Sequence, residues 1–428
     1  MKSLHWFRHD LRVHDNPALK QINQDASELL CVYVLDEQQL EQQDFDPMQI
    51  GKQKGMVNLS QHRRHFLYQS LVDLNNNLAK LGQKLYVAYG EPVSVLSDLC
   101  KTHEIECVSS TWHPGVIEQE QWRSLQAISN KQQYLQLNGN LLYEEADFPF
   151  SLENMPDTFS PFRRKVEKYC DVKLNTVHID DFAPCVDTQY LFEVDKLNIS
   201  EVTGEYTGGA SAALARVQEY FWQTDNIAHY KETRNGFDGW DFSSRLSAWL
   251  ALGCISPKQV LVELHDYEKQ RTKNESTYWL FFELLWREFF HWQHHKHGAR
   301  FFKKSGVQGK QLNTKFDHHN FNNWVNGTTG YPILDACMRQ LKDTGFMSNR
   351  GRQIVASCFV HELQQDWRYG AAYFEHQLVD FDVASNYGNW QYLAGVGSDP
   401  RGHRQFNLVK QAQHYDPDGS FVNSWLNK

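Results

Sequence analysis

Charged and amide side chains recur inside an otherwise apolar stretch, residues 344–390. Burying such groups is costly unless they are paired or hydrogen-bonded. The pattern therefore fits the lining of a polar ligand pocket, and it fits a pair of helices with one solvated face equally well. The polar residues are Asn349, Arg350, Arg352, Asp380, Asp382 and Asn386, and the same stretch contains Trp367 and Trp390.

A second candidate site is a glutamate within an aromatic stripe. Trp279, Glu283, Trp286 and Phe290 are spaced 4, 3 and 4, which places them on one face of a helix. Aromatic stripes usually belong to a core, where an unpaired carboxylate is unusual. A cleft in which Trp286 packs on a flat base and Glu283 hydrogen-bonds the edge of that base accounts for both side chains.

A third candidate site is a short run of hydroxyls that precedes an apolar helical segment, residues 248–252. Three hydroxyls and an arginine beside a helix start can donate to a phosphate. Plain capping of the helix explains the serines as well. The run is Ser243, Ser244, Arg245, Leu246 and Ser247.

The elements that position these residues follow two different patterns. In the N-terminal third, short segments rich in Val, Tyr and Leu alternate with helical segments, which predicts a parallel sheet wrapped by helices. Ligands of such sheets bind at the carboxyl ends of the strands, and no GxGxxG follows the first strand. The predicted strands are 3–7, 29–35, 84–89 and 106–111, and the predicted helices are 62–81 and 93–102.

The rest of the chain divides into a connector and a helical part. Residues 133–202 contain four prolines and little periodicity, with one short helix expected at 161–169. Long aromatic and leucine stripes then indicate helices up to residue 428. We therefore predict an α/β domain at 1–132, a connector at 133–202 and a larger all-α domain at 203–428.

Composition limits the class of protein. The net charge of −9 argues against a protein that coats nucleic acid, although residues 201–428 are balanced and could carry a local basic surface for phosphates. Eight cysteines without a CxxC pair indicate reduced thiols and a cytoplasmic location, and no metal site is implied. No apolar run is long enough to cross a membrane.

Several long motifs resemble a known family. The resemblance covers most of the 428 residues and is to the photolyase/cryptochrome family, specifically its DASH cryptochrome branch. It implies an N-terminal antenna domain and an all-helical C-terminal domain that holds FAD in a bent conformation. The motifs are TGFMSNRGRQ, DWRYGAAYFEHQLVDFDVASNYGNW, AGVGSDPRGHRQFN, YKETRNG, SSRLSAWLALGCISP, STYWLFFELLWREFF, TGYPILDACMRQL and HWFRHDLRVHDNPAL.

The resemblance also implies roles for single residues around FAD. The serine–arginine run and Tyr230 would hold the pyrophosphate, Asp382 would hydrogen-bond the flavin ring or its ribityl edge, and Asn386 would stand near the nitrogen that is protonated on reduction. The implied cofactor-binding residues are Tyr230, Ser243, Ser244, Arg245, Leu246, Ser247, Arg287, Asn349, Arg352, Asp380, Asp382 and Asn386.

On the substrate side, the resemblance implies contacts to a pyrimidine dimer. Two positions depart from duplex photolyases, because Gln353 and Tyr392 stand where methionine and tryptophan are usual. Each lost aromatic contact weakens base stacking by roughly 1–3 kcal/mol, and single-stranded DNA spares the base-flipping cost of about a few kcal/mol. The implied substrate residues are Arg234, Glu283, Trp286, Arg350, Gln353 and Tyr392, and the implied catalytic residues are Glu283, Trp286, Asn349, Trp390 and Trp367.

Two further departures concern auxiliary functions. Trp390 and Trp367 match the inner and middle members of the family's tryptophan electron chain, but Thr314 replaces the outer tryptophan. We therefore expect slow photoreduction unless Trp324, Phe316 or a nearby tyrosine substitutes. The family's antenna glutamate aligns with Gly115, and Glu118 or Glu120 could compensate, so a methenyltetrahydrofolate antenna is a weaker expectation than FAD.

The expected function is light-dependent repair of cyclobutane pyrimidine dimers, mainly in single-stranded DNA, by electron transfer from excited reduced FAD. The main rival is a blue-light photoreceptor that signals through the flavin redox state without repair. A third hypothesis is a light-independent flavoprotein that binds RNA or DNA. We expect a monomer.

Overall fold

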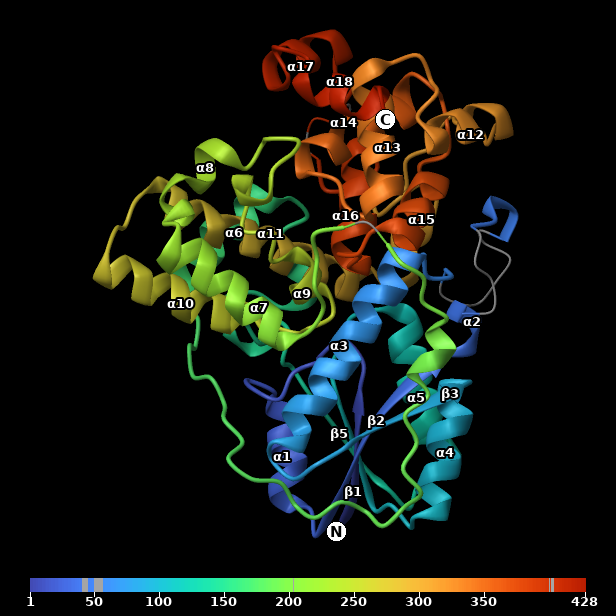
Figure 1. Cartoon of the computed structure of the whole chain (residues 1–428), viewed down its shortest axis with the longest axis vertical. Coiled ribbons are helices and arrows are strands. Elements are labelled where there is room, and N and C mark those ends of the chain that lie inside the picture. Colours follow the sequence, from blue (N-terminus) through green and yellow to red (C-terminus); the bar gives the residue numbers. More distant parts are fainter. Residues whose placement is uncertain (41–44, 50–56, 203, 400, 402–403) are drawn as a thin grey trace.

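The N-terminal domain is built on a five-stranded parallel sheet, which is the lower half of the computed structural model in Figure 1. The structure describes residues 1–40, 45–49, 57–202, 204–399, 401 and 404–428. The strand order is β3-β2-β1-β4-β5. The strands are β1 (Lys2–Phe7), β2 (Glu28–Asp36), β3 (Leu85–Gly90), β4 (Cys107–Thr111) and β5 (Gln133–Leu137).

Helices cover both faces of this sheet. Leu4, Trp6 and Val32 pack on one face against side chains of α4 (Pro92–Thr102) and α5 (Val116–Ile128). The opposite face carries Phe7 and Cys31, which pack against α1 (Pro17–Asp25) and α3 (Gln61–Ala79). That second core continues into the helical domain, so the sheet and the helices above it share one apolar interior.

The predicted fold class is confirmed, and the four predicted strands and two predicted helices are present. β5 occupies the first five residues of the segment predicted as a connector, so the sheet extends beyond residue 132. The short helix predicted at 161–169 is α6 (Phe159–Tyr169). The remainder of the connector runs back along the sheet (Figure 1), where single parallel bridges join Cys185 to Leu29 and Phe192 to Val87. It thereby covers the edge of β3, which would otherwise expose unpaired backbone groups.

The C-terminal domain is helical. Its longest helix, α11 (Glu275–His297), contacts α16 (Val383–Ala394), which packs in turn on α14 (Asn349–His361) and α15 (Trp367–Gln377). In the described ranges, no helix is both long and apolar enough to cross a membrane. The other helices are α7 (Ala210–Val217), α8 (Tyr230–Thr233), α9 (Ser247–Ala251), α10 (Pro257–Gln270), α12 (His318–Asn326), α13 (Pro332–Thr344), α17 (Leu408–Tyr415) and α18 (Ser420–Leu426), and α2 (Glu37–Leu40) belongs to the first domain.

Buried charged groups hold the two domains together. Arg12 is fully buried and donates from Nη1 to the main-chain oxygen of Gly253 at 2.8 Å. From the helical domain, the buried carboxyl group of Glu288 on α11 accepts hydrogen bonds from the backbone N–H groups of Leu142 (3.0 Å) and Tyr143 (3.2 Å), which follow β5. It also accepts from the indole N–H of Trp292 on the same helix at 2.8 Å. These bonds fix α11 relative to the sheet, and α11 carries the aromatic stripe of the candidate site.

Candidate active site

A large cavity opens in the helical domain and gathers most of the predicted site residues. Its empty space, including the open mouth, is about 1650 Å³, and an adjoining cavity of about 550 Å³ shares several of its walls. Pockets for drug-sized ligands are commonly about 300–1,000 Å³, so this space suits a larger ligand. The predicted residues that line the larger cavity are Tyr230, Arg234, Ser243, Ser244, Arg245, Leu246, Ser247, Glu283, Trp286, Arg287, Asn349, Arg352, Gln353, Asp380 and Tyr392. Asp382, Asn386 and Trp390 line the adjoining one.

The serine–arginine run forms a loop with an unusual backbone at its centre. Arg245 has φ of +60°, a left-handed conformation that residues other than glycine seldom adopt and that often marks a functional site. Its Nη2 donates to the Gly239 carbonyl at 2.7 Å and its guanidinium lies 4.1 Å from the Phe346 ring centroid. Its Nε is buried and has no partner among the described residues. The loop thus places a buried, unpartnered guanidinium N–H and three serines in the cavity wall, and such donors suit a phosphate.

An ion pair forms the next part of the wall. Ser348 caps the start of α14 by accepting from the Gly351 N–H, and this places Arg352 over the cavity. Arg352 Nη2 lies 2.8 and 3.0 Å from the two carboxylate oxygens of Asp380, and its Nε donates to the Met347 carbonyl at 2.8 Å. This ion pair compensates the buried carboxylate of Asp380.

Asp382 and Asn386 lie at the start of α16. Asp382 is the N-cap, because its Oδ1 accepts from the Ser385 N–H at 2.7 Å, and its Oδ2 accepts from His291 Nε2 at 2.8 Å. Burial opposes ionisation, but His291 holds the pKa of Asp382 well below its usual range. Asn386 donates from Nδ2 to the Ala371 carbonyl at 2.9 Å. That bond uses an amide N–H, so the side-chain oxygen of Asn386 stays available to a donor in the cavity.

Glu283 and Trp286 lie on the cavity side of α11. Glu283 Oε1 lies 2.8 Å from Arg234 Nη2. Burial raises the pKa of Glu283, and the charge of Arg234 opposes this shift. One face of the Trp286 indole stacks on Phe159, with ring centroids 3.7 Å apart and planes at 13°, while Tyr392 meets it edge-on at 5.9 Å. Trp286 is only partly buried and lines the cavity, so part of its indole is left for a ligand ring.

Two predicted site residues are not among those that line either cavity. The guanidinium of Arg350 lies 4.4 Å from the Tyr415 ring centroid and donates to Asn235 Oδ1 at 3.3 Å. Trp367 is fully buried, and its indole N–H donates to the Lys304 carbonyl at 3.0 Å. Arg287 lines the larger cavity but also reaches the first domain, where it donates to the Asn140 carbonyl at 2.7 Å.

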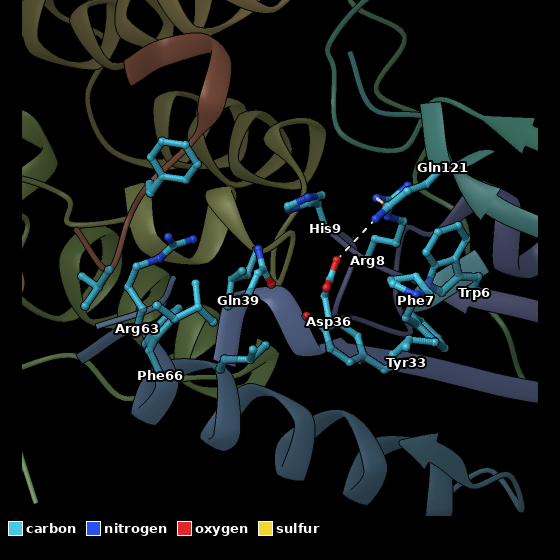
Figure 2. A pocket seen from close by; sticks show the side chains of 17 residues that line it. Trp6, Phe7, Arg8, His9, Tyr33, Asp36, Gln39, Arg63, Phe66 and Gln121 are labelled. Carbon is cyan, nitrogen blue, oxygen red and sulfur yellow. Dashed lines mark hydrogen bonds between the residues drawn. The ribbon is translucent and has the colours of Figure 1, made fainter. Parts of the chain in front are cut away.

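A separate pocket, of about 730 Å³, lies at the carboxyl ends of β1 and β2. Figure 2 shows Arg8, Asp36 and Gln121 converging on one side of it and Arg63 and Phe66 on the other. Gln121 Nε2 donates to Asp36 Oδ2 at 3.4 Å across this pocket. The position agrees with the expectation that ligands of such sheets bind at the strand ends.

A His–His–Glu cluster borders this pocket. His9 Nε2 and His113 Nδ1 lie 3.0 and 3.7 Å from Glu118 Oε1. The two imidazole rings are stacked, with an angle of 22° between their planes. A metal ion bound by two histidines lies close to the plane of each ring, and one ion cannot lie in both planes when the rings are stacked. A Cβ added at Gly115 would lie 1.9 Å from Glu118 Oε2. The carboxylate of Glu118 therefore occupies the space beside Gly115, whereas Glu120 is exposed.

Comparisons with known proteins agree over the whole chain. The model of the FAD binding domain of DNA photolyase matches residues 279–428, and the DNA photolyase model matches residues 3–180. A cryptochrome DASH of Idiomarina loihiensis is 44% identical over 420 residues, which cover 98% of this chain and 91% of that protein. The chain belongs to the photolyase/cryptochrome family, in its DASH branch.

Solved structures show the same relationship. A Synechocystis sp. PCC6803 cryptochrome superposes on this DASH cryptochrome with a TM-score of 0.92 at 37% identity, covering 100% of this chain and 89% of that one. An archaeal photolyase from Sulfolobus tokodaii with two FAD molecules superposes with a TM-score of 0.80 at 25% identity, covering 100% and 90%.

FAD is the cofactor of this DASH cryptochrome, and the cavity fits it. The unpartnered Arg245 Nε and the neighbouring serine hydroxyls suit the pyrophosphate. Asp382, Asn386 and the Arg352–Asp380 pair offer acceptors and donors at the adjoining end, where a polar ring system can be recognised. When bound, FAD supplies the light-driven electron-transfer chemistry of the site.

Two residues of the site were missed by the sequence reasoning. His291 is buried on α11 and holds Asp382 in place, but no spacing links residues so far apart in the chain. Arg404 lies 4.7 Å from the centroid of the Tyr392 ring and bonds both the Tyr392 hydroxyl and Asp399. The GHRQF part of the third motif contains Arg404, so the resemblance could have indicated it.

Proposed function

We propose that this DASH cryptochrome repairs cyclobutane pyrimidine dimers in single-stranded DNA under blue light. One observation carries the proposal: the Glu283–Arg234 pair and the partly exposed Trp286 indole line the same cavity as the residues that fit FAD. Glu283 accepts from a pyrimidine N–H, and Arg234 donates to the adjacent carbonyl. Trp286 provides the stacking surface, so a dimer bound here stays in reach of the cofactor.

The single-strand preference rests on the opposite wall. Tyr392 meets Trp286 edge-to-face and its hydroxyl is tied to Arg404, so its ring is not parallel to the Trp286 indole and does not extend that stacking surface. Gln353 places an amide where an apolar side chain would bury more of the dimer. The contact to the dimer is therefore weaker by roughly 1–3 kcal/mol per base. The remaining contact energy does not offset the free energy of flipping a dimer out of a duplex, and a single strand avoids most of that cost.

The test is repair of one thymine dimer in matched single-stranded and duplex oligonucleotides by purified, reduced protein under blue light. We expect a tenfold or greater preference for the single strand. Glu283→Gln should lower repair more than it lowers binding of undamaged DNA. Equal repair of both substrates would contradict the preference. A flavin-loaded protein that repairs neither would instead favour the rival function, a photoreceptor without repair activity.

We also propose that Trp390 is oxidised first when the oxidised flavin is photoreduced, with Trp367 next. Trp390 lines the cavity beside Asn386, and Trp367 lies deeper in the protein. Thr314 is buried and cannot act as an outer donor, because an aliphatic hydroxyl is not oxidised by a tryptophan radical cation. Blue-light photoreduction with a thiol should therefore be lost in Trp390→Phe.

We also propose that the protein binds a folate antenna. Glu118 supplies a carboxylate next to Gly115, where the family's antenna glutamate is absent. Burial raises the pKa of Glu118, but His113 and His9 outweigh burial and keep it well below the usual range, so the carboxylate is charged. Purification after folate supplementation, followed by near-ultraviolet absorbance of wild type and Glu118→Ala, tests this role.

A further inference from the structure

A buried tyrosine–carboxylate pair lies behind the cavity and has no part in the proposed repair. Tyr387 on α16 donates its phenol O–H to Glu375 Oε2 on α15 at 2.9 Å. Both side chains are buried. Tyr387 follows Asn386 directly and lies one helical turn before Trp390, so the pair is carried by the same helix as two residues of the flavin end of the cavity.

The pair lies next to the middle tryptophan of the proposed electron chain. The ring centroids of Trp367 and Tyr387 are 6.2 Å apart, with an edge-to-face angle of 76°. Ring edges in such a contact approach van der Waals distance, and electrons move rapidly over so short a gap. Trp367 itself is fully buried, so an external reductant cannot reach it directly.

Glu375 makes this tyrosine a good electron donor. A phenol that loses an electron becomes a strong acid, so tyrosine is oxidised easily only where a base already accepts its proton. Burial raises the pKa of Glu375, and the Tyr387 hydrogen bond and Arg63 only partly oppose this. The carboxylate thus has a higher proton affinity than one in water, and it is already in place at hydrogen-bond distance.

The rival branch lacks such a base. The Trp324 ring meets Trp390 at 6.1 Å and Tyr373 at 5.6 Å, so a second aromatic path leaves the inner tryptophan. Within the residues that the structure describes, no carboxylate is hydrogen-bonded to the Tyr373 phenol. Phe316, which stacks on Tyr369 at 4.0 Å, has no proton to release and is hard to oxidise.

We propose that Tyr387 is the outer electron donor of photoreduction and replaces the tryptophan missing at Thr314. This inference rests on the Trp390–Trp367 chain of the proposed function, in which the photoexcited oxidised flavin is the electron acceptor. The Trp367 radical cation takes one electron from Tyr387, the phenol O–H bond breaks, and its proton passes to the Glu375 carboxylate. The products are neutral Trp367, a neutral tyrosyl radical and a neutral Glu375 carboxyl group. A thiolate in solution then supplies one electron, and Glu375 returns its proton to the buried phenoxyl oxygen, which restores the phenol and the carboxylate.

The experiment is electron paramagnetic resonance of the FAD-loaded protein, frozen during blue illumination, in wild type and variants. We expect a neutral tyrosyl radical that narrows when the tyrosine ring is deuterated. Its yield should fall at least tenfold in Tyr387→Phe, which keeps the ring, and in Glu375→Gln, which keeps a hydrogen-bond acceptor but removes the base. Tyr373→Phe and Trp324→Phe are matched controls on the rival branch and should leave the signal unchanged. In wild type, its formation should slow at least twofold in D₂O.

The outcomes separate this inference from the function on which it rests. If the flavin of Trp390→Phe is still photoreduced, Trp390 and Trp367 do not form the electron-transfer chain, and Tyr387 cannot be its outer donor. If Trp390→Phe is inactive but the tyrosyl signal survives Tyr387→Phe, only the assignment to Tyr387 is overturned. A signal lost in Tyr373→Phe would move the donor to the Trp324 branch. Because Tyr387→Phe removes the hydrogen bond to the buried Glu375 Oε2, Glu375→Gln provides the second test if the first variant binds no FAD.

Discussion

Replacing Asp382 separates its structural role from its proposed role toward the flavin. Asp382→Ala removes the N-cap of α16 and the acceptor for His291. The lost cap lowers the free energy of unfolding by about 1 kcal/mol, and the unpaired His291 N–H lowers it by about 1–3 kcal/mol more. Asp382→Asn keeps one oxygen for the cap, and its amide can donate to the other tautomer of His291. We therefore expect losses of about 2–4 kcal/mol for alanine and about 1 kcal/mol or less for asparagine.

Flavin affinity should follow a different order. Both variants remove the carboxylate, so both should lose the charged acceptor for a flavin N–H, which weakens FAD binding by about 1–3 kcal/mol, or roughly 5- to 150-fold. Urea unfolding of FAD-free protein measures the first effect, and titration of flavin fluorescence measures the second. Asp382→Asn with unchanged FAD affinity would remove Asp382 from the flavin site. Equal destabilisation by both variants would refute the capping argument.

Three further predictions concern buried groups. Arg352→Ala leaves a buried carboxylate unpaired and should lower the unfolding free energy by about 3 kcal/mol in urea unfolding, with Arg352→Lys intermediate. Burial raises the pKa of Glu288 from 4.5 to about 7, so the folded state binds this proton more tightly and the free energy of unfolding should fall as pH rises from 4.5 to 7. Unfolding measured against pH should show a smaller fall over this range in Glu288→Gln. Gly253→Ala would bring a Cβ to 2.0 Å from the His9 carbonyl oxygen and should lower the melting temperature far more than Gly82→Ala, where space is open.

The fold was largely predictable because its signals are local. Strands β1, β2 and β3 are mainly apolar runs, β4 is buried throughout, and helical segments separate them, so each can be identified from its own sequence. β5 was missed because QYLQL is an edge strand with two glutamines in five residues and no fully buried position, which gives neither an apolar run nor a buried face.

The residues of the site were predictable only where they belong to a sequence motif or share one face of a helix. The spacing of Glu283 and Trp286 placed both on one helix face, and the structure agrees. The His291–Asp382 bond, the left-handed Arg245 and the occupation of the space beside Gly115 by Glu118 depend on tertiary contacts between distant segments. The resemblance implied Arg350 as a substrate residue, whereas α14 places its guanidinium against Tyr415 of α17.

The order in which the cavity walls occur along the chain has a consequence for synthesis on the ribosome. The sheet is complete at Leu137, whereas the walls of the FAD cavity extend from Tyr230 to Phe406. At about 5–20 residues per second, translation from Leu137 to Phe406 takes roughly 13–54 s. During that interval the nascent chain has a folded α/β domain but no complete binding site for the cofactor. FAD capture is therefore expected only after the segment up to Phe406 has been synthesised.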